Sequence, residues 1–308
     1  MTHSVLAIVT AALCLLTTFP SQSSPQRIEA TYNFVWKGML VSTAETVAEM
    51  DEASYSLDVE MRMRGLAKLF VGGGKTIFSA HGLVGEDGSI QPRWYQSSGK
   101  WKGNPYKESL TYDAQGNLTG FVKDWPEKWR EENRRKPVPS ALQNGHDPAS
   151  LLVALIRHPL PISTLARGAA SSSFQVFDGD TVINWRVGCK DTPVIVKKSR
   201  HSDATGEAYE CTLKSQLIAG ERILTPKQKA KEEKKQRKAA RKRKSKRKSK
   251  KQYDGPVKVW MQKVASGAYW LPVRALVPSK KGTVRVYLKE LALNEMPAAS
   301  SVSNTASR

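Results

Sequence analysis

The chain has 308 residues, 40% of them apolar, and a formal net charge of +21. This length accommodates one large β domain or two ordinary domains, and the apolar fraction suffices for a real core. The charge is concentrated in residues 227–251, where sixteen Lys or Arg and two Glu give a net +14. The remaining +7 is only moderately basic, so the folded body does not have the composition of a polyanion binder, and nucleic acid is not an expected partner.

The N-terminus has the pattern of a secretory signal peptide. Residues 5–19 form an unbroken run of apolar and small residues that is too short to span a bilayer comfortably. Pro20 and small residues follow, which predicts cleavage near Ser23 or Ser24 and export to the periplasm. Residues 1–4 lack Lys and Arg, which departs from the usual pattern, and an uncleaved N-terminal anchor is the alternative. We therefore assign residues 1–24 to the signal peptide.

Two cysteines remain after removal of the signal, which contains Cys14. Cys189 and Cys211 both fall in the apolar register of strand-like segments, and a cysteine pair in an exported chain favours a disulfide. Two buried free thiols are the alternative. The two cysteines are far apart in sequence and have no His at ligand spacing, so we expect no metal site and no cofactor.

Alternating apolar and polar residues predict strands along most of the chain. Residues 55–64 show the clearest alternation, and a strand with one polar face is typical of an antiparallel sheet. Asp178-Gly179 predicts a two-residue hairpin turn between strands at 174–177 and 183–189. The other predicted strands are residues 30–37, 76–80, 93–97, 109–113, 209–214, 257–261, 270–274 and 283–291.

One helix is predicted, beginning at Asp147 as N-cap with Pro148 at the first helical position. Residues 123–144 are polar and bounded by prolines, which indicates a surface loop. The predicted fold class is mainly β: a single antiparallel curved sheet, forming an open barrel or a β-spiral, with the helix packed in its concavity. We expect one domain over residues 25–296, interrupted by a basic low-complexity insertion at 226–252, and a disordered tail at 297–308.

Short motifs in a fixed order resemble the bacterial domain-of-unknown-function 3108 family over about residues 27–293. They are Tyr32…Trp36-Lys37-Gly38, Gly88…Pro92, Asp147-Pro148-Ala149-Ser150-Leu151, Phe177-Asp178-Gly179, Cys211…Ala219-Gly220 and Leu271-Pro272-Val273-Arg274. The resemblance implies an exported, β-rich envelope protein, similar to cell-envelope-integrity spiral proteins and more distantly to lipoprotein-carrier half-barrels. It supplies no catalytic residues, and the basic run departs from the family pattern.

Two motifs suggest catalysis or nucleotide binding. Gly74-Lys75-Thr76 resembles the end of a phosphate-binding loop, but Leu69 stands where that motif requires glycine. Ser97 and Lys100 fit S-x-x-K, which acylating enzymes use with the two residues one helical turn apart. Here the motif lies in a glycine-containing region between a predicted strand and a turn, where the two side chains need not converge. A serine hydrolase of the cell envelope is therefore the alternative rather than the expected function.

The basic run has no apolar stripe and no interleaved aromatic residues, which disfavours a membrane-embedded helix or a platform for stacking bases. Anionic lipid head groups are the partners it would attract, and a solvated loop without a partner is the alternative. The residues we expect to bind anions are Lys234, Lys235, Arg237, Lys238, Arg241, Lys242, Arg243, Lys244, Lys246, Arg247, Lys248, Lys250 and Lys251.

The sequence thus predicts a periplasmic, non-enzymatic protein with no catalytic residues. We expect it to bind an envelope protein or an apolar or lipid ligand in the concavity of its sheet. A protein that acts through its basic run on a polyanion is a further alternative.

Overall fold

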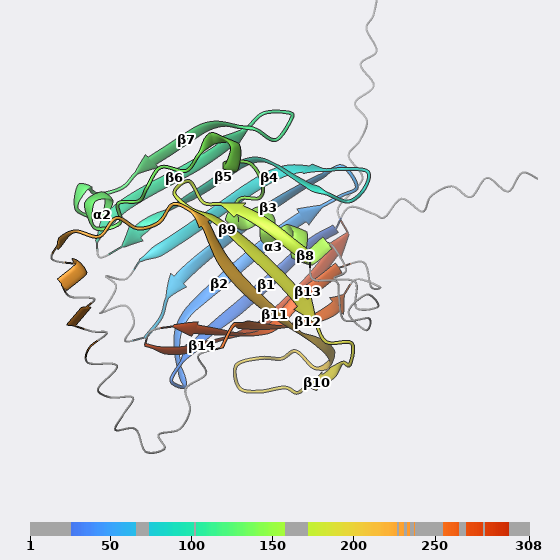
Figure 1. Cartoon of the computed structure of the whole chain (residues 1–308). Helices are drawn as coiled ribbons and strands as arrows, with labels where there is room; N and C mark the ends of the chain where they lie inside the picture. The colour runs from blue at the N-terminus through green and yellow to red at the C-terminus, as the bar shows by residue number, and fades with distance from the viewer. Residues whose placement is uncertain are drawn as a thin grey trace, which may run out of the picture.

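The computed structural model describes residues 26–65, 74–101, 103–157, 172–226, 255–264, 269–279 and 281–295, together with 228–230, 233–234 and 237. The described residues form mainly antiparallel β structure (Figure 1). Its strands are β1 (Gln26–Trp36), β2 (Met39–Met50), β3 (Ser54–Met63), β4 (Lys75–Val84), β5 (Ile90–Trp101), β6 (Asn104–Tyr112), β7 (Leu118–Asp124), β8 (Ser172–Phe177), β9 (Val182–Cys189), β10 (Val194–Val196), β11 (Gly206–Ala219), β12 (Val257–Val264), β13 (Tyr269–Ser279) and β14 (Gly282–Glu295).

A single sheet contains all these strands, in the order β7-β6-β5-β4-β3-β2-β1-β14-β13-β12-β11-β9-β8, with β10 paired to β11. The first and last strands, β1 and β14, meet at its centre in antiparallel pairing, as the blue and red strands of Figure 1 show. The end strands β7 and β8 are not paired with each other, so the sheet is open. This confirms the predicted mainly β, curved and open sheet.

The sheet is accompanied by α2 (Glu127–Glu132), the 3-10 turn η1 (Ser140–Leu142) and α3 (Pro148–Arg157). Helix α3 is the predicted helix, and it packs against β3, β4, β5, β8 and β13, within the curve of the sheet (Figure 1). It brings together elements from both ends of the strand order. The predicted helix in the concavity is therefore confirmed.

The segment at 123–144 was predicted to be a surface loop, and that prediction is wrong in part. It contains the end of β7, α2 and η1, although no residue of α2 or η1 is buried. Pro126 lies two residues beyond the end of β7 and stands at the N-cap of α2, where its missing N–H costs nothing. The segment then bonds to a distant part of the chain, because Lys136 N–H donates to the Glu221 carbonyl at 2.9 Å.

The predicted hairpin of β8 and β9 is present, but its turn has four residues rather than two. The Asp178 carboxylate accepts the backbone N–H of Asp180 and of Thr181, and it also accepts the Thr181 hydroxyl. A side chain that accepts hydrogen bonds from the backbone two and three residues ahead forms an Asx-turn, and this turn lengthens the loop. Gly179 takes a φ of 93°, which only glycine adopts readily.

The open seam between the two ends of the sheet is bridged by side chains. The ring of Phe121 on β7 meets the ring of Phe177 on β8 edge to face at 6.5 Å, and Lys123 forms an ion pair with Asp180. A Cβ added at Gly179 would come within 2.3 Å of the Phe121 ring, so a larger residue there would push the two edges apart. The two edges are therefore held together without backbone pairing between them.

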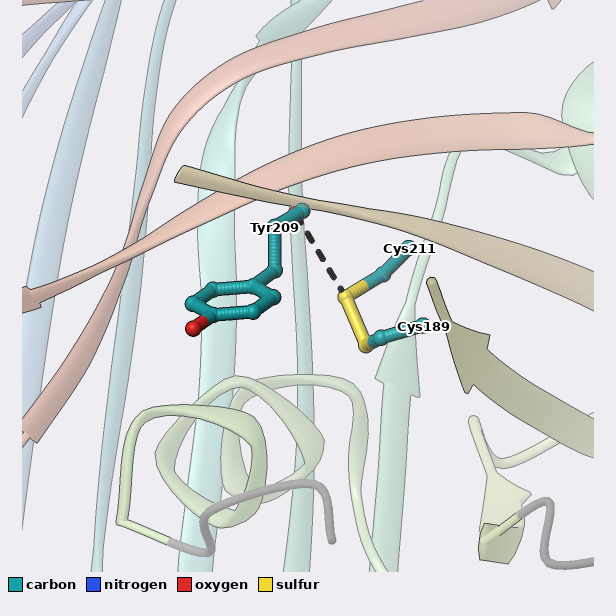
Figure 2. The surroundings of a disulfide bond; sticks show 3 residues. All are labelled: Cys189, Tyr209 and Cys211. Carbon is teal, nitrogen blue, oxygen red and sulfur yellow. Dashed lines mark hydrogen bonds between the residues drawn. A yellow bond between two sulfur atoms is a disulfide. The ribbon is translucent and has the colours of Figure 1, made fainter. Parts of the chain in front are cut away.

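The disulfide is formed as predicted. Cys189 on β9 and Cys211 on β11 are direct partners in the register, with Cα atoms 3.8 Å apart (Figure 2). Both cysteines are buried, in a cluster that includes Met261 and Trp270. The Tyr209 carbonyl oxygen lies 3.7 Å from the Cys211 sulfur, a contact rather than a true hydrogen bond because a disulfide sulfur carries no proton.

Cys189→Ser should lower the free energy of unfolding by about 2–4 kcal/mol, because the bond closes a loop that the unfolded chain would otherwise explore. Urea denaturation without reductant measures the difference. Wild-type protein with reductant should lose the same amount, and Cys189→Ser should not respond to reductant. Two free thiols found on titration of the unfolded native protein would show that the pair is not formed.

Candidate functional site: an aromatic pocket in the concavity

The inner face of the sheet is the face that helix α3 contacts. The helix covers only part of this face. The buried cluster that surrounds Val153 of α3 includes Leu57, Ala80, Tyr95 and Leu110, from four adjacent strands. Side chains alternate along a strand, so the residues two positions away from these also point inward. On β5 and β6 these are Ser97 and Glu108, and they begin the part of the concavity that α3 does not fill.

The N-terminus of α3 is fixed by Asp147, whose side chain is completely buried. Its carboxylate accepts the backbone N–H of Ala149 at 2.8 Å and of Ser150 at 2.9 Å, and it accepts the Ser150 hydroxyl. The Ser150 hydroxyl is also 2.7 Å from the hydroxyl of Tyr55 on β3. Burial raises the pKa of Asp147, and these hydrogen bonds oppose the rise. The helix is thereby anchored at one place in the concavity.

A pocket of about 430 Å³ lies beside the region that α3 fills. This volume is within the range typical of small-molecule sites. Strands β4, β5 and β6 contribute part of its lining, and α2 with its flanking residues contributes the rest. The lining residues are Phe78, Ser97, Tyr106, Glu108, Trp125, Trp129, Glu132 and Asn133.

The strand register explains how these residues meet. Phe78 on β4 is the partner of Ser97 on β5, Ser97 is the partner of Glu108 on β6, and Glu108 is the partner of Lys123 on β7. These four side chains therefore form a row across the inner face. Ser97 is only 2% exposed, whereas Glu132 is exposed, so the pocket runs from a buried floor to a solvent-facing rim.

Three aromatic rings form the wall. Trp125 and Trp129 meet at an interplanar angle of 89° with centroids 6.2 Å apart, and Tyr106 meets Trp125 at 77° and 6.5 Å. The Tyr106 hydroxyl donates to Thr76 Oγ1 at 3.1 Å, which fixes the orientation of its ring. Rings at right angles present faces and edges to one shared space, as in an aromatic cage.

Glu108 is a half-buried carboxyl group of the pocket. Its pKa is raised from 4.5 to about 7, chiefly by burial and to a smaller extent by the Asp178 carboxylate, while the Lys123 ammonium and the Trp125 indole partly oppose the rise. Lys123 does not neutralise Glu108 directly, because its ion pair is with Asp180. Glu108 therefore titrates near neutral pH.

Of the pocket residues, Ser97 alone was a candidate from the sequence, and for a different role, as the nucleophile of the hydrolase alternative. A signal was present in β6, where Tyr106, Leu110 and Tyr112 alternate inward and Glu108 interrupts them with a carboxylate. A charged residue on an otherwise apolar strand face is unusual without a partner or a function. Trp125 and Trp129, four residues apart beside Pro126, lie in the segment that the sequence predicts to be a surface loop.

The serine-hydrolase alternative finds no support in the arrangement of its residues. Ser97 is buried on the inner face of β5, whereas Lys100, three residues further along the same strand, is exposed. Residues three apart on a strand point to opposite faces, so the lysine cannot take a proton from the serine. Gly74 precedes β4 directly, which is not the strand-loop-helix setting of a phosphate-binding loop.

Most of the predicted anion-binding residues, and the predicted signal peptide and tail, lie outside the described residues. Of the basic run, Lys234 and Arg237 are described, and both are exposed. The insertion connects β11 to β12, which are hydrogen-bonded neighbours in the sheet. Within the described ranges, no three His, Cys, Asp or Glu side chains are grouped to hold a metal ion, and no helix is long and apolar enough to cross a membrane.

The chain matches a known protein family. A family model described as "Protein of unknown function (DUF3108)" matches residues 29–289. The match covers nearly the whole sheet from β1 to β14, so the protein belongs to this family, as the order of its motifs suggested. No curated protein and no solved structure gives a significant match.

Glu108→Gln should stabilise the protein at alkaline pH. Because the folded-state pKa is raised, the protonated carboxyl favours folding below pH 4.5, and that contribution is lost as the pH rises through about 7. At pH 8 the variant should unfold with a free energy about 2 kcal/mol higher than wild type, after allowance for the solvent that still reaches the carboxyl. At pH 4 the two proteins should be equal.

Urea denaturation at the two pH values gives this difference directly. Glu132→Gln serves as the control, since its exposed side chain at the pocket rim should leave stability unchanged at both pH values. An advantage of Glu108→Gln that is the same at pH 4 and pH 8 would show that Glu108 does not carry a raised pKa.

Proposed function

We propose that this protein is a non-enzymatic binding protein of the bacterial cell envelope, which holds a small ligand in the concavity of its sheet. The observation that carries this proposal is the division of the concavity: α3 fills one part, and an aromatic pocket of about 430 Å³ occupies the next. A side-chain-lined pocket of this size beside a rigidly packed helix is a typical setting for ligand binding.

Export is part of the proposal. It is supported by the signal-like residues 1–24 and by the disulfide, since such bonds persist in oxidising compartments such as the periplasm. The separation of Ser97 and Lys100 on opposite strand faces favours binding over hydrolysis.

Native mass spectrometry of the protein purified gently from its own cell envelope tests the binding function. The wild-type protein should carry a small molecule, and Trp129→Ala should lose it, because Trp129 forms one wall of the pocket. Trp94→Ala is the matched control: Trp94 stacks on His81 and lies next to Tyr95 on β5, so it faces away from the pocket. Wild type without a bound molecule, or equal loading of wild type and Trp129→Ala, would contradict the proposal.

A second candidate function is attachment to an anionic membrane surface through the basic run. It is favoured by the position of the insertion, which leaves and re-enters the sheet between the paired strands β11 and β12. Lys234 and Arg237 are exposed there. Each basic residue close to an anionic bilayer contributes up to about 1 kcal/mol of electrostatic attraction. Even a partial sum of this attraction over the run exceeds the attraction of the remaining chain, which carries +7.

Deletion of residues 227–251 should leave the thermal unfolding transition almost unchanged and abolish binding to vesicles that contain phosphatidylglycerol. Binding of the full chain should weaken as salt is added, because the Debye length shrinks. The hydrogen bonds between residues 134–136 and 220–223 lie outside the deletion and should keep that contact in place. Unfolding of the deletion variant, or vesicle binding that survives the deletion, would overturn this second function.

A further inference from the structure

The charges of the pocket restrict the ligand that it can hold. Two carboxylates, Glu108 and Glu132, line it, and no Lys or Arg among the described residues does, although the chain as a whole carries +21. Among the described residues, neither carboxylate has an ion-pair partner within 4 Å. An anionic ligand such as a fatty acid would have to place its carboxylate among these acids, which like-charge repulsion disfavours.

The aromatic wall complements a positive charge. Ring faces carry partial negative charge and attract ammonium groups, most strongly when the ring is tryptophan. The structure contains an example at this site, because the Lys123 ammonium lies over the Trp125 ring, 3.9 Å from its centroid. Lys123 is not among the residues that line the pocket, so the rings and the carboxylates that face the cavity are available to a ligand.

We propose that the pocket binds an organic cation, an amine or quaternary ammonium with a small apolar body. This inference rests on the proposed binding function and deepens it. The three rings of Tyr106, Trp125 and Trp129 enclose the cationic group, Glu108 provides the opposite charge at the buried end, and Glu132 attracts the cation at the rim. A neutral ligand of the same shape would gain the apolar contacts but neither electrostatic contribution.

The protonation state of Glu108 makes the affinity for a cation depend on pH. The groups that surround it are Lys123 from β7, Asp178 from the β8–β9 turn, Tyr95 from β5, the Trp125 indole, and Glu132 at the rim. The carboxyl of Glu108 titrates near neutral pH. A cation should therefore bind several-fold more tightly at pH 8, where Glu108 is ionised, than at pH 5.5.

Isothermal titration calorimetry with two matched probes tests the inference. Choline carries a trimethylammonium group, and 3,3-dimethylbutan-1-ol is its neutral isostere. Choline should bind the full-length protein at least about tenfold more tightly than the isostere. Trp129→Ala should lower the affinity for choline by a similar factor, Glu108→Gln should remove the dependence on pH, and Trp94→Ala should bind like wild type.

The outcomes separate this inference from the broader function. Equal binding of the two probes, or no binding of choline at pH 8, would overturn the cation site. If the molecule that co-purifies with the protein proved to be a neutral sugar or a fatty acid bound through Trp129, the cation inference would fail and the binding function would stand. An affinity for choline that is unchanged in Trp129→Ala would also overturn it, since the cation would then bind elsewhere.

Discussion

The inner face of a curved sheet must be covered, and in this protein a helix of ten residues is the element that covers it. A helix this short cannot fill the whole concavity, so its position decides where apolar core ends and accessible space begins. Asp147 sets that position. Its buried carboxylate caps the first turn of α3 and, through Ser150, reaches Tyr55 on β3. Capping matters here because unsatisfied N–H groups at a buried helix end would be costly.

The pocket follows from the same arrangement. The row of inward side chains on β4, β5 and β6 continues past the helix and ends at the seam, where Lys123 pairs with Asp180 and Phe121 meets Phe177. The chain then turns at Pro126 and lays α2 beside the pocket, with Trp125 and Trp129 as its wall. Binding chemistry is thus placed between an anchored helix and a seam held by side chains. The disulfide lies on the opposite part of the sheet, between β9 and β11, where it secures the strands near the other edge.

Local patterns in the sequence were sufficient for most of the fold. Alternation in β3, the N-cap at Asp147 and the apolar register of both cysteines depend on nearby residues, and all three predictions are confirmed. Strand β2 was missed because its small and polar residues, rich in Ala, Thr and Glu, show little alternation, and its pairing with β1 and β3 overrides this weak preference. The pocket could not be predicted, because it depends on register: only the pairing of Ser97 with Glu108, and the return of α2 over them, brings its residues together.

One part of the concavity is packed around α3, and the adjacent part is open as the pocket. A pair of matched substitutions tests this division most directly, with unfolding free energies measured by urea denaturation. Ala80 and Ser97 are both buried on the inner face, Ala80 in the core around α3 and Ser97 at the floor of the pocket. Ala80→Phe should cost about 2–3 kcal/mol through overpacking, whereas Ser97→Phe should change stability by less than about 1 kcal/mol, because its ring enters open space. Equal destabilisation by the two substitutions would contradict the account.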